Sequence, residues 1–319
     1  MNEKKRDKLR ASRVFIAMGI IVVTLFGADG LRRGLESQKP YNLKVQGVFR
    51  DNYNCEEPST GNSLSYNAAD PFGGVENTAF SECELSKEDV SKGLLAIYTE
   101  SKPAKESDQT AMVKLIDRKN EYYTLCEEDI SLNADAANAL NTMMEDYQNE
   151  TSLADFIVYG TTETYTGDYS YCPKEFSESM SGYCIDLALN AGGTVLSYDG
   201  CDAEGWIVEN CWRYGFIVRC PDGKKEKTGN EYCPWHLRYV GDINAAIMKQ
   251  KGLCLEEYVD FLEQYTLEEP YSFSFNNTAY QIYTVSGNED KIVIRTPISG
   301  NYEISGDNRK SFIITALKD

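Results

Sequence analysis

Two residues could take part directly in a reaction: His236, the single histidine of the chain, and Cys233, three residues before it. A thiol activated by an imidazole base is a nucleophile, so this pair is one candidate for covalent catalysis. On a β-strand, however, an offset of three residues places two side chains on opposite faces. We therefore keep the thiol–imidazole pair as an alternative and ask what else surrounds the histidine.

The chain has ten cysteines, and none is spaced as Cys-x-x-Cys. This spacing argues against a zinc ribbon and against a thioredoxin-like site. An even number of cysteines outside the cell permits disulfides, but the sequence does not determine how they pair. Free, buried thiols are the alternative.

Short strands and helices are expected around these residues. Apolar runs predict strands at 93–98, 112–117, 156–159 and 216–219. Apolar residues at helical spacing predict helices at 136–147, 203–214 and 255–262. Ser131 is a candidate cap for the first helix, and Gly215 is expected to end the second.

The N-terminus has the pattern of a membrane signal. Residues 1–13 hold six Lys or Arg and two Asp or Glu, and Val14–Ala28 is an uncharged run of 15 residues. A basic segment before an apolar run predicts a signal anchor with its basic side in the cytoplasm, and a cleaved signal peptide is the alternative. The body of the protein is then expected outside the membrane.

Composition shifts divide the rest of the chain. Residues 280–285, 291–295 and 311–315 are short β-type runs separated by Gly and Asn. The expected organisation is a basic tail at 1–13, a transmembrane anchor at 14–28, an extracytoplasmic linker or extension at 29–90, a main domain at 91–268 and a small β-rich appendix at 269–319.

The net negative charge of the chain argues against two classes of binding partner, nucleic acids and anionic lipid surfaces. The net charge is −18, although the first 13 residues are basic. A strongly acidic body repels the phosphate backbone, so the composition argues against nucleic-acid binding. It also argues against adhesion of the body to an anionic lipid surface.

Two segments and their order along the chain resemble a known family. One is Ser177-Glu178-Ser179-Met180-Ser181-Gly182-Tyr183-Cys184-Ile185-Asp186, and the other is Cys233-Pro234-Trp235-His236-Leu237-Arg238-Tyr239-Val240-Gly241. Between and after them stand Gly205–Pro221, Lys227-Thr228-Gly229 and Leu253–Tyr258. Together they are similar to the VanY-type D-alanyl-D-alanine carboxypeptidases over about 93–263, and the tail at 302–315 resembles appendices of some members.

The resemblance implies an α+β fold, in which helices pack around a small antiparallel sheet and a zinc ion lies at one edge. It also implies removal of the terminal D-alanine from cell-wall peptides. That chemistry needs three zinc ligands that leave a position for water, a carboxylate base, and a cation that holds the substrate carboxylate.

The first motif of the family reads Ser-x-His-x-x-Gly-x-Ala-x-Asp. Ser177 and Gly182 match it, and Asp186 stands at the position of a metal ligand. Ser179 stands where the first histidine ligand belongs, and Cys184 replaces the alanine. A neutral serine hydroxyl is a poor zinc ligand, so we expect Ser179 not to bind the metal.

The second motif retains the other histidine ligand as His236, but Cys233 stands where the catalytic glutamate belongs. Thr162 takes the place of the arginine that binds substrate in the family segment Ser-Gly-Tyr-Arg. Candidate substrate-binding residues are therefore Ser177, Thr162, Trp235 and Arg238, where Trp235 is a cleft wall or core. Arg238 is alternatively a structural ion-pair partner.

Two readings of function follow from these replacements. Loss of a catalytic base alone typically lowers the rate by about 100- to 10,000-fold. Here a zinc ligand, the base and the substrate-binding arginine are all replaced, and these groups act together in one catalytic site. We expect an inactive homologue that binds a peptidoglycan stem peptide or a cell-wall protein, with zinc absent or weakly bound. The alternative is an active zinc peptidase with a remodelled site that uses Asp186, His236 and a cysteine, either Cys233 or Cys184, because thiolate is a strong zinc ligand. If the cysteine filled the last position on the metal, so that no water could bind, the site would be structural and not catalytic. In a further alternative, Asp186 and His236 bond only to each other or to the backbone and bind no metal.

Overall fold

The computed structural model describes residues 80–105, 108–109, 111–160, 178–201, 205–297 and 301–318. All of them lie in one compact unit, Gly47–Asp319. The predicted basic tail and anchor lie outside the described residues, as does most of the predicted extension. No helix in the described part of the chain is both long and apolar enough to cross a membrane.

The central element is a mostly antiparallel six-stranded sheet. Its strands are β3 (Thr124–Leu125), β5 (Phe156–Tyr159), β6 (Cys184–Ala191), β7 (Thr194–Ser197), β8 (Phe216–Cys220) and β9 (Cys233–Tyr239). The order is β3-β5-β6-β9-β8, with β7 paired to β6, and β3–β5 is the parallel pair. The two middle strands, β6 and β9, therefore lie side by side and are flanked by strands on both sides.

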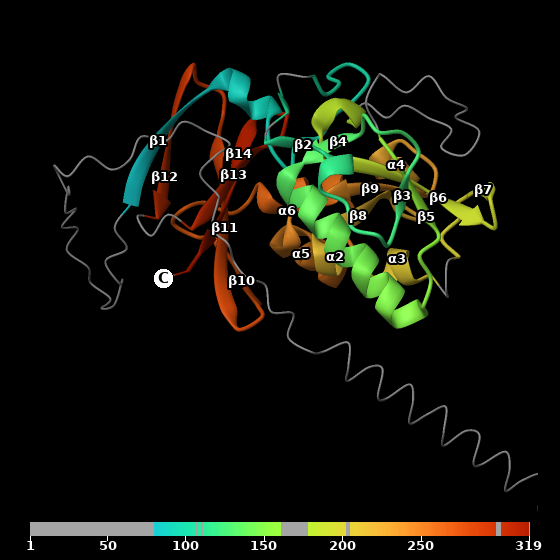
Figure 1. Ribbon diagram of the computed structural model, residues 1–319. Coiled ribbons are helices and arrows are strands. Elements are labelled where there is room, and N and C mark those ends of the chain that lie inside the picture. Colours follow the sequence, from blue (N-terminus) through green and yellow to red (C-terminus); the bar gives the residue numbers. More distant parts are fainter. Residues whose placement is uncertain are drawn as a thin grey trace, which may run out of the picture. The chain divides into compact units, whose positions relative to one another are not determined.

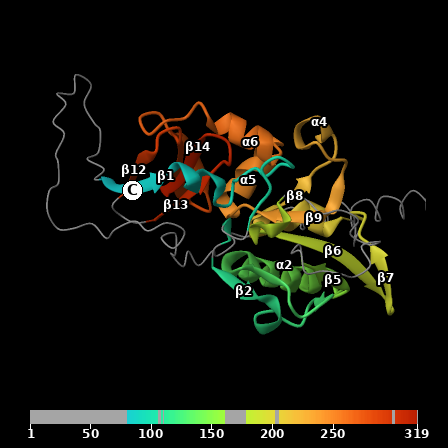
Figure 2. The ribbon, with the colours of Figure 1, turned by 90° about the horizontal axis from the view of Figure 1, so that it is seen from above.

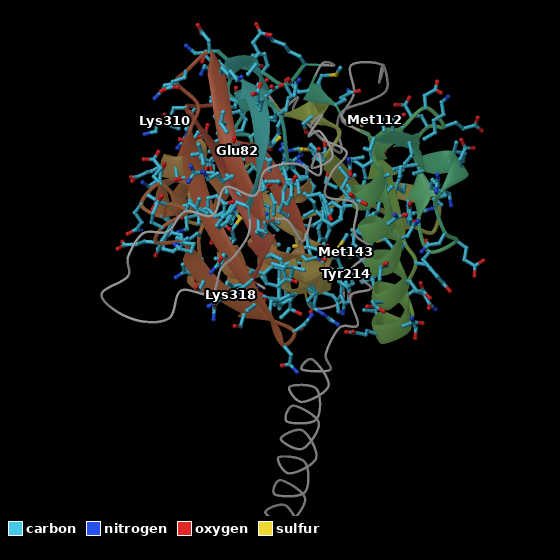
Figure 3. The ribbon with its side chains drawn as sticks, turned by 90° about the vertical axis from the view of Figure 1, so that its left-hand side faces the viewer. Glu82, Met112, Met143, Tyr214, Lys310 and Lys318 are labelled. Carbon is cyan, nitrogen blue, oxygen red and sulfur yellow. The ribbon has the colours of Figure 1, made fainter. Side chains whose placement is uncertain are left out.

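Helices cover both faces of this sheet, as Figure 2 shows with α2 (Ala134–Thr151) on one face and α5 (Asp242–Lys251) and α6 (Leu255–Leu262) on the other. The apolar stripe of α2 is buried, and it includes Leu140, Met143 and Tyr147. Near Met143, the Tyr214 hydroxyl donates to the Asp146 carboxylate at 2.7 Å, which ties α2 to the segment before β8 (Figure 3).

The predicted helix boundaries were correct in part. The cap of α2 is Asn133, whose side chain accepts hydrogen bonds from the backbone of Asp135 and Ala136, whereas Ser131 belongs to the strand β4 (Ser131–Asn133). The predicted helix at 203–214 is a short α3 (Trp206–Asn210) followed by a 3-10 turn, η6 (Cys211–Tyr214). Gly215 ends it with a φ of 75°, as predicted.

The remaining short elements are η1 (Lys87–Ser91), β2 (Met112–Lys114), η3 (Leu115–Asp117), η4 (Ser179–Ser181) and α4 (Lys225–Thr228). The predicted strand at 112–117 is thus shorter, because it turns into η3. The predicted strands at 156–159 and 216–219 and the last helix are confirmed.

Much of the predicted appendix forms an antiparallel sheet (Figure 1). Its strands are β10 (Tyr271–Phe275), β11 (Thr278–Ser286), β13 (Tyr302–Gly306) and β14 (Ser311–Leu317), in the order β10-β11-β14-β13. A separate two-stranded ribbon pairs β1 (Phe80–Ser86) with β12 (Lys291–Pro297). The last part of the predicted extension therefore supplies a strand next to the appendix.

The predicted strand at 93–98 was wrong. These residues form an irregular segment that packs against the appendix, where Leu95 N–H donates to Ser305 Oγ at 2.8 Å and Ile97 N–H donates to the Asp307 carbonyl. Nearby, a Cβ atom on Gly306 would lie 2.1 Å from the Val90 carbonyl oxygen, so only glycine permits this approach of η1 to β13. The side chains of Leu95 and Ile97 are buried in a cluster that combines α5, α6 and the appendix, whereas Ala96 and Tyr98 belong to a separate small cluster.

Candidate active site

The two middle strands bring the predicted metal ligands together. Asp186 on β6 lies directly opposite His236 on β9, and Cys184 lies opposite Arg238 two residues along. Residues two apart on a strand share a face, so all four side chains belong to one side of the sheet. The Asp186 Oδ1 atom lies 2.6 Å from His236 Nδ1.

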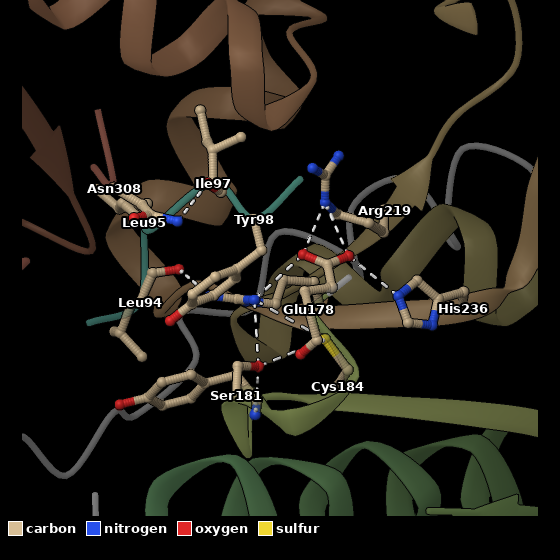
Figure 4. A network of polar contacts seen from close by, with 12 residues as sticks. Leu94, Leu95, Ile97, Tyr98, Glu178, Ser181, Cys184, Arg219, His236 and Asn308 are labelled. Carbon is tan, nitrogen blue, oxygen red and sulfur yellow. Dashed lines mark hydrogen bonds and ion pairs between the residues drawn. The ribbon is translucent and has the colours of Figure 1, made fainter. Parts of the chain in front are cut away.

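A residue that the motif comparison did not consider completes this group. Glu178 precedes η4 and is 3% exposed. Its Oε1 atom lies 3.0 Å from His236 Nε2, so the second ring nitrogen of the histidine also faces a carboxylate. Both nitrogens of the only histidine are therefore occupied by acidic partners, and Figure 4 shows the contact with Glu178.

This arrangement sets the charge of the histidine. Burial alone would lower the pKa of His236, but the charge of Asp186 and the hydrogen bonds with Asp186, Cys184 and Glu178 raise it well above its ordinary value. The raised pKa favours a ring that carries both protons and donates one N–H to each carboxylate. A metal ion at this ring would have to displace one of those protons.

Two buried arginines share Glu178 with the histidine. Arg219 on β8 places Nε 3.0 Å from Oε2 and 2.9 Å from Oε1, and Arg238 places NH1 3.2 Å from Oε2. Burial alone would raise the pKa of Glu178, but Arg219, the hydrogen bond from His236 and Arg238 outweigh it and hold the pKa well below its usual range. Glu178 is therefore ionised and fully engaged.

Each arginine is also anchored on its far side. Arg219 makes a bidentate ion pair with Glu256 of α6, at 3.2 Å and 2.5 Å. Arg238 is 0% exposed, donates from NH2 to the Leu94 carbonyl at 3.1 Å, and lies over the rings of Tyr98 and Tyr183. Arg219, Arg238 and the imidazole of His236 thus face the carboxyl groups of Glu178, Asp186 and Glu256.

The other predicted site residues fall in different places. Ser177 and Thr162 lie outside the described residues, and Ser179 begins η4. Cys233 lies opposite Cys220 of β8, in the same strand as His236. Trp235 is half-buried and packs against Ile157, Tyr159 and Ala188, which fits a wall of the apolar cluster.

Within the part of the chain that the structure describes, Glu178, Cys184 and His236 are the group whose potential ligand atoms all lie within 4.8 Å of one another. Their chemistry does not fit a zinc ion in this arrangement. A zinc ion would have to displace a ring proton of His236 and compete with two buried arginines for Glu178. The cysteine in this group is Cys184 and not Cys233.

The residues that sequence reasoning missed are Glu178, Arg219 and Glu256. Glu178 stands at an unspecified position of the first motif, between Ser177 and Ser179. The signal that could have found it is Arg219 at the end of an apolar strand, because a buried arginine needs a carboxylate partner.

Comparisons with known proteins agree with the motifs. A family model described as D-alanyl-D-alanine carboxypeptidase, VanY, matches residues 147–242. A D-alanyl-D-alanine carboxypeptidase of Enterococcus faecium is 32% identical over 258 residues, which are 77% of this chain and 81% of that protein. The bifunctional D-Ala-D-Ala dipeptidase and D-Ala-D-Ala carboxypeptidase VanXYC of Enterococcus gallinarum is 44% identical over 92 residues, which are 28% of this chain and 48% of that protein.

A solved structure supports the same assignment over most of the described body. The vancomycin resistance D,D-dipeptidase VanXYg, crystallised with a D-Ala-D-Ala phosphinate analogue, has a TM-score of 0.62 and 25% identity, and it covers 75% of this chain and 99% of its own. The match confirms the predicted resemblance and its mixed helix-and-sheet fold. The chain belongs to the VanY-type D-alanyl-D-alanine carboxypeptidase family.

Proposed function

We propose that this chain is a non-hydrolytic member of its family that binds the stem peptide of peptidoglycan or a protein of the cell wall. The observation that carries this proposal is the state of His236, with both ring nitrogens bonded to Asp186 and Glu178. The family chemistry needs a metal with an open position for water. Here the acidic and imidazole groups that would supply ligands are used in ion pairs.

The replacements at the two motif positions support the same proposal. Cys233 stands where the family has its catalytic glutamate, and its buried thiol belongs to a residue paired with Cys220 on the neighbouring strand. Ser179 stands where the family has a histidine ligand. Neither group supplies what was lost, since a serine hydroxyl binds zinc poorly and a buried thiol is a poor general base.

The test uses the full chain in a mild detergent and a pentapeptide that ends in D-Ala-D-Ala. Binding is measured by calorimetry and D-alanine release by an enzyme-coupled assay, each with and without added zinc. We expect binding without release. Release that depends on zinc and stops with a chelator would instead favour the remodelled peptidase that uses Asp186, His236 and Cys184.

A matched pair of variants tests the placement of the motifs. Ser179→His with Cys233→Glu restores the two missing family groups, whereas Glu231→Gln changes an exposed acid near the same strand. We expect the first variant to gain zinc affinity only when Glu178→Gln is added, because Glu178 then no longer holds the imidazole proton. No gain in any combination would count against the placement.

We further propose that residues 14–28 hold the chain at the cell membrane as a single pass, with the body outside. The support is the uncharged run that follows the basic tail. Protease added to intact cells should degrade the body and leave the tail protected, and extraction of the chain by alkaline carbonate alone would contradict the anchor.

A further inference from the structure

Two thiols lie directly opposite each other beside the candidate site. The pairing of β8 with β9 places Cys220 against Cys233, and both side chains are buried, at 1% and 2% exposed. The two thiols are close enough to influence each other's pKa. Neither contributes to the described network of Glu178, His236 and the two arginines.

The geometry of this pair suits a disulfide. Residues directly opposite in antiparallel strands have Cα atoms about 4.5–5.5 Å apart, depending on the type of pair. A disulfide requires Cα atoms about 4.4–6.8 Å apart, so an opposite pair of either type falls within the range.

The strands around the pair would gain from a covalent link. The register of the two strands shifts between the pairs Val218–Leu237 and Cys220–Cys233. Over this stretch β9 contains more residues than β8, as in a β-bulge. Such an irregularity interrupts the ladder of hydrogen bonds. Since β8 is also an edge strand, its end at Cys220 is held less firmly than the middle of the sheet.

Three of the other described cysteines lie in different settings. Cys184 lies opposite Arg238, while Cys211 and Cys254 lie in helical segments or at their caps. Cys83 on β1 is already disulfide-bonded, so this chain carries disulfide chemistry elsewhere. The interaction between the two thiols lowers the pKa of Cys220 and, together with burial, raises the pKa of Cys233 well above its ordinary value, so Cys220 is the first of the two to lose its proton.

We propose that Cys220 and Cys233 form a disulfide through exchange with a small-molecule disulfide while the chain folds or while β8 transiently opens. The Cys220 thiolate attacks one sulfur of the donor and releases one donor thiol. The Cys233 thiolate then attacks the mixed disulfide and releases the second. Two cysteine thiols lose two electrons and two protons, and the donor disulfide gains both and becomes two thiols.

The bond would fix both sides of the polar network. Cys220 directly follows Arg219 on β8, and Cys233 precedes His236 by three residues on β9. A link at this end therefore holds the guanidinium and the imidazolium at fixed positions around Glu178. It also removes Cys233 as a nucleophile or metal ligand, whether or not the site binds a stem peptide.

The direct test is a disulfide map of the full chain. The chain is unfolded and refolded with glutathione disulfide and its thiol, alkylated while denatured, and digested without reductant. We expect a linked peptide pair that contains Cys220 and Cys233 and separates on reduction. Cys211 is the internal control, because it should be alkylated before and after reduction. Alkylation of both Cys220 and Cys233 as free thiols, or their linkage to other cysteines, would overturn the proposal.

A stability measurement gives an independent readout. A disulfide that closes a loop of this length changes the folding equilibrium by on the order of 100-fold. Reduction should therefore shift the urea midpoint of the wild-type chain more than that of the Cys220→Ser, Cys233→Ser double variant, which keeps the other cysteines. Equal shifts in the two proteins would contradict the proposal, and neither readout depends on peptide binding or D-alanine release.

Discussion

Glu178→Gln is the perturbation that probes the buried network most sharply. The substitution keeps the shape of the side chain and removes the one carboxylate that contacts His236, Arg219 and Arg238, at 2.9–3.2 Å. Each charge-assisted hydrogen bond of this kind contributes about 1.5–3 kcal/mol. Removal of one partner of a buried ion pair typically destabilises a protein by about 3–5 kcal/mol, because the remaining charges stay buried and unmatched. We therefore expect Glu178→Gln to lower the free energy of unfolding by about 3–5 kcal/mol.

The assay combines urea unfolding with NMR of the imidazole. His236 is the only histidine, so one ring signal reports the site without assignment. We expect the pKa of His236 to fall in the variant, because a carboxylate that favours the charged ring has been removed. Glu231→Gln is the matched control, since Glu231 pairs with Lys225 in solvent and the change should alter stability by about 0.5 kcal/mol or less. A loss for Glu178→Gln no larger than that of the control, with an unchanged imidazole titration, would refute the reasoning.

Two further changes test other parts of the fold. Burial, together with Asp135 and Asp242, raises the pKa of Glu303 to about 8 from an ordinary 4.5. The folded state therefore binds more protons than the unfolded state between these two values, and its stability falls as the pH rises through this window. In the wild-type chain, this group should lower the free energy of unfolding by about 2–4 kcal/mol between about pH 5 and about pH 8. The Glu303→Gln variant should lack that part of the pH dependence, and the same pH dependence in both proteins would contradict the prediction. Asn133→Ala should lower the unfolding free energy by about 1 kcal/mol because it removes the cap of α2, and Ser131→Ala should change it less; the reverse order in urea unfolding would contradict the assignment of the cap.

Much of the fold was predictable because local patterns and packing agree. Phe156–Tyr159 is apolar throughout and forms a strand that is buried on both faces. Gly215 ends a helical segment because its positive φ suits glycine, and this signal is visible in the sequence. The segment at 93–98 was assigned wrongly, since its backbone bonds to a strand some 200 residues later and its apolar side chains pack among distant elements, and no local pattern encodes those contacts.

The candidate site was predictable at its two family positions. The motifs brought out Asp186 and His236, and the structure places them opposite each other at 2.6 Å. The carboxylate that completes the group is Glu178, and its role depends on Arg219 from a strand some 40 residues later. An ion pair between distant strands leaves no mark in local spacing, so only the three-dimensional arrangement identifies it. The opposition of Cys220 and Cys233 is hidden for the same reason.

We propose that the buried ion network around Glu178 and His236 occupies the place where the motif comparison puts the metal of the family. The most direct measurement is zinc titration of the full chain, followed by the ring signal of His236 and by the metal retained after dialysis. We predict a ring signal that does not move at stoichiometric zinc and far less than one retained zinc per chain. One tightly retained zinc per chain, with loss of the ring protons of His236, would contradict the account.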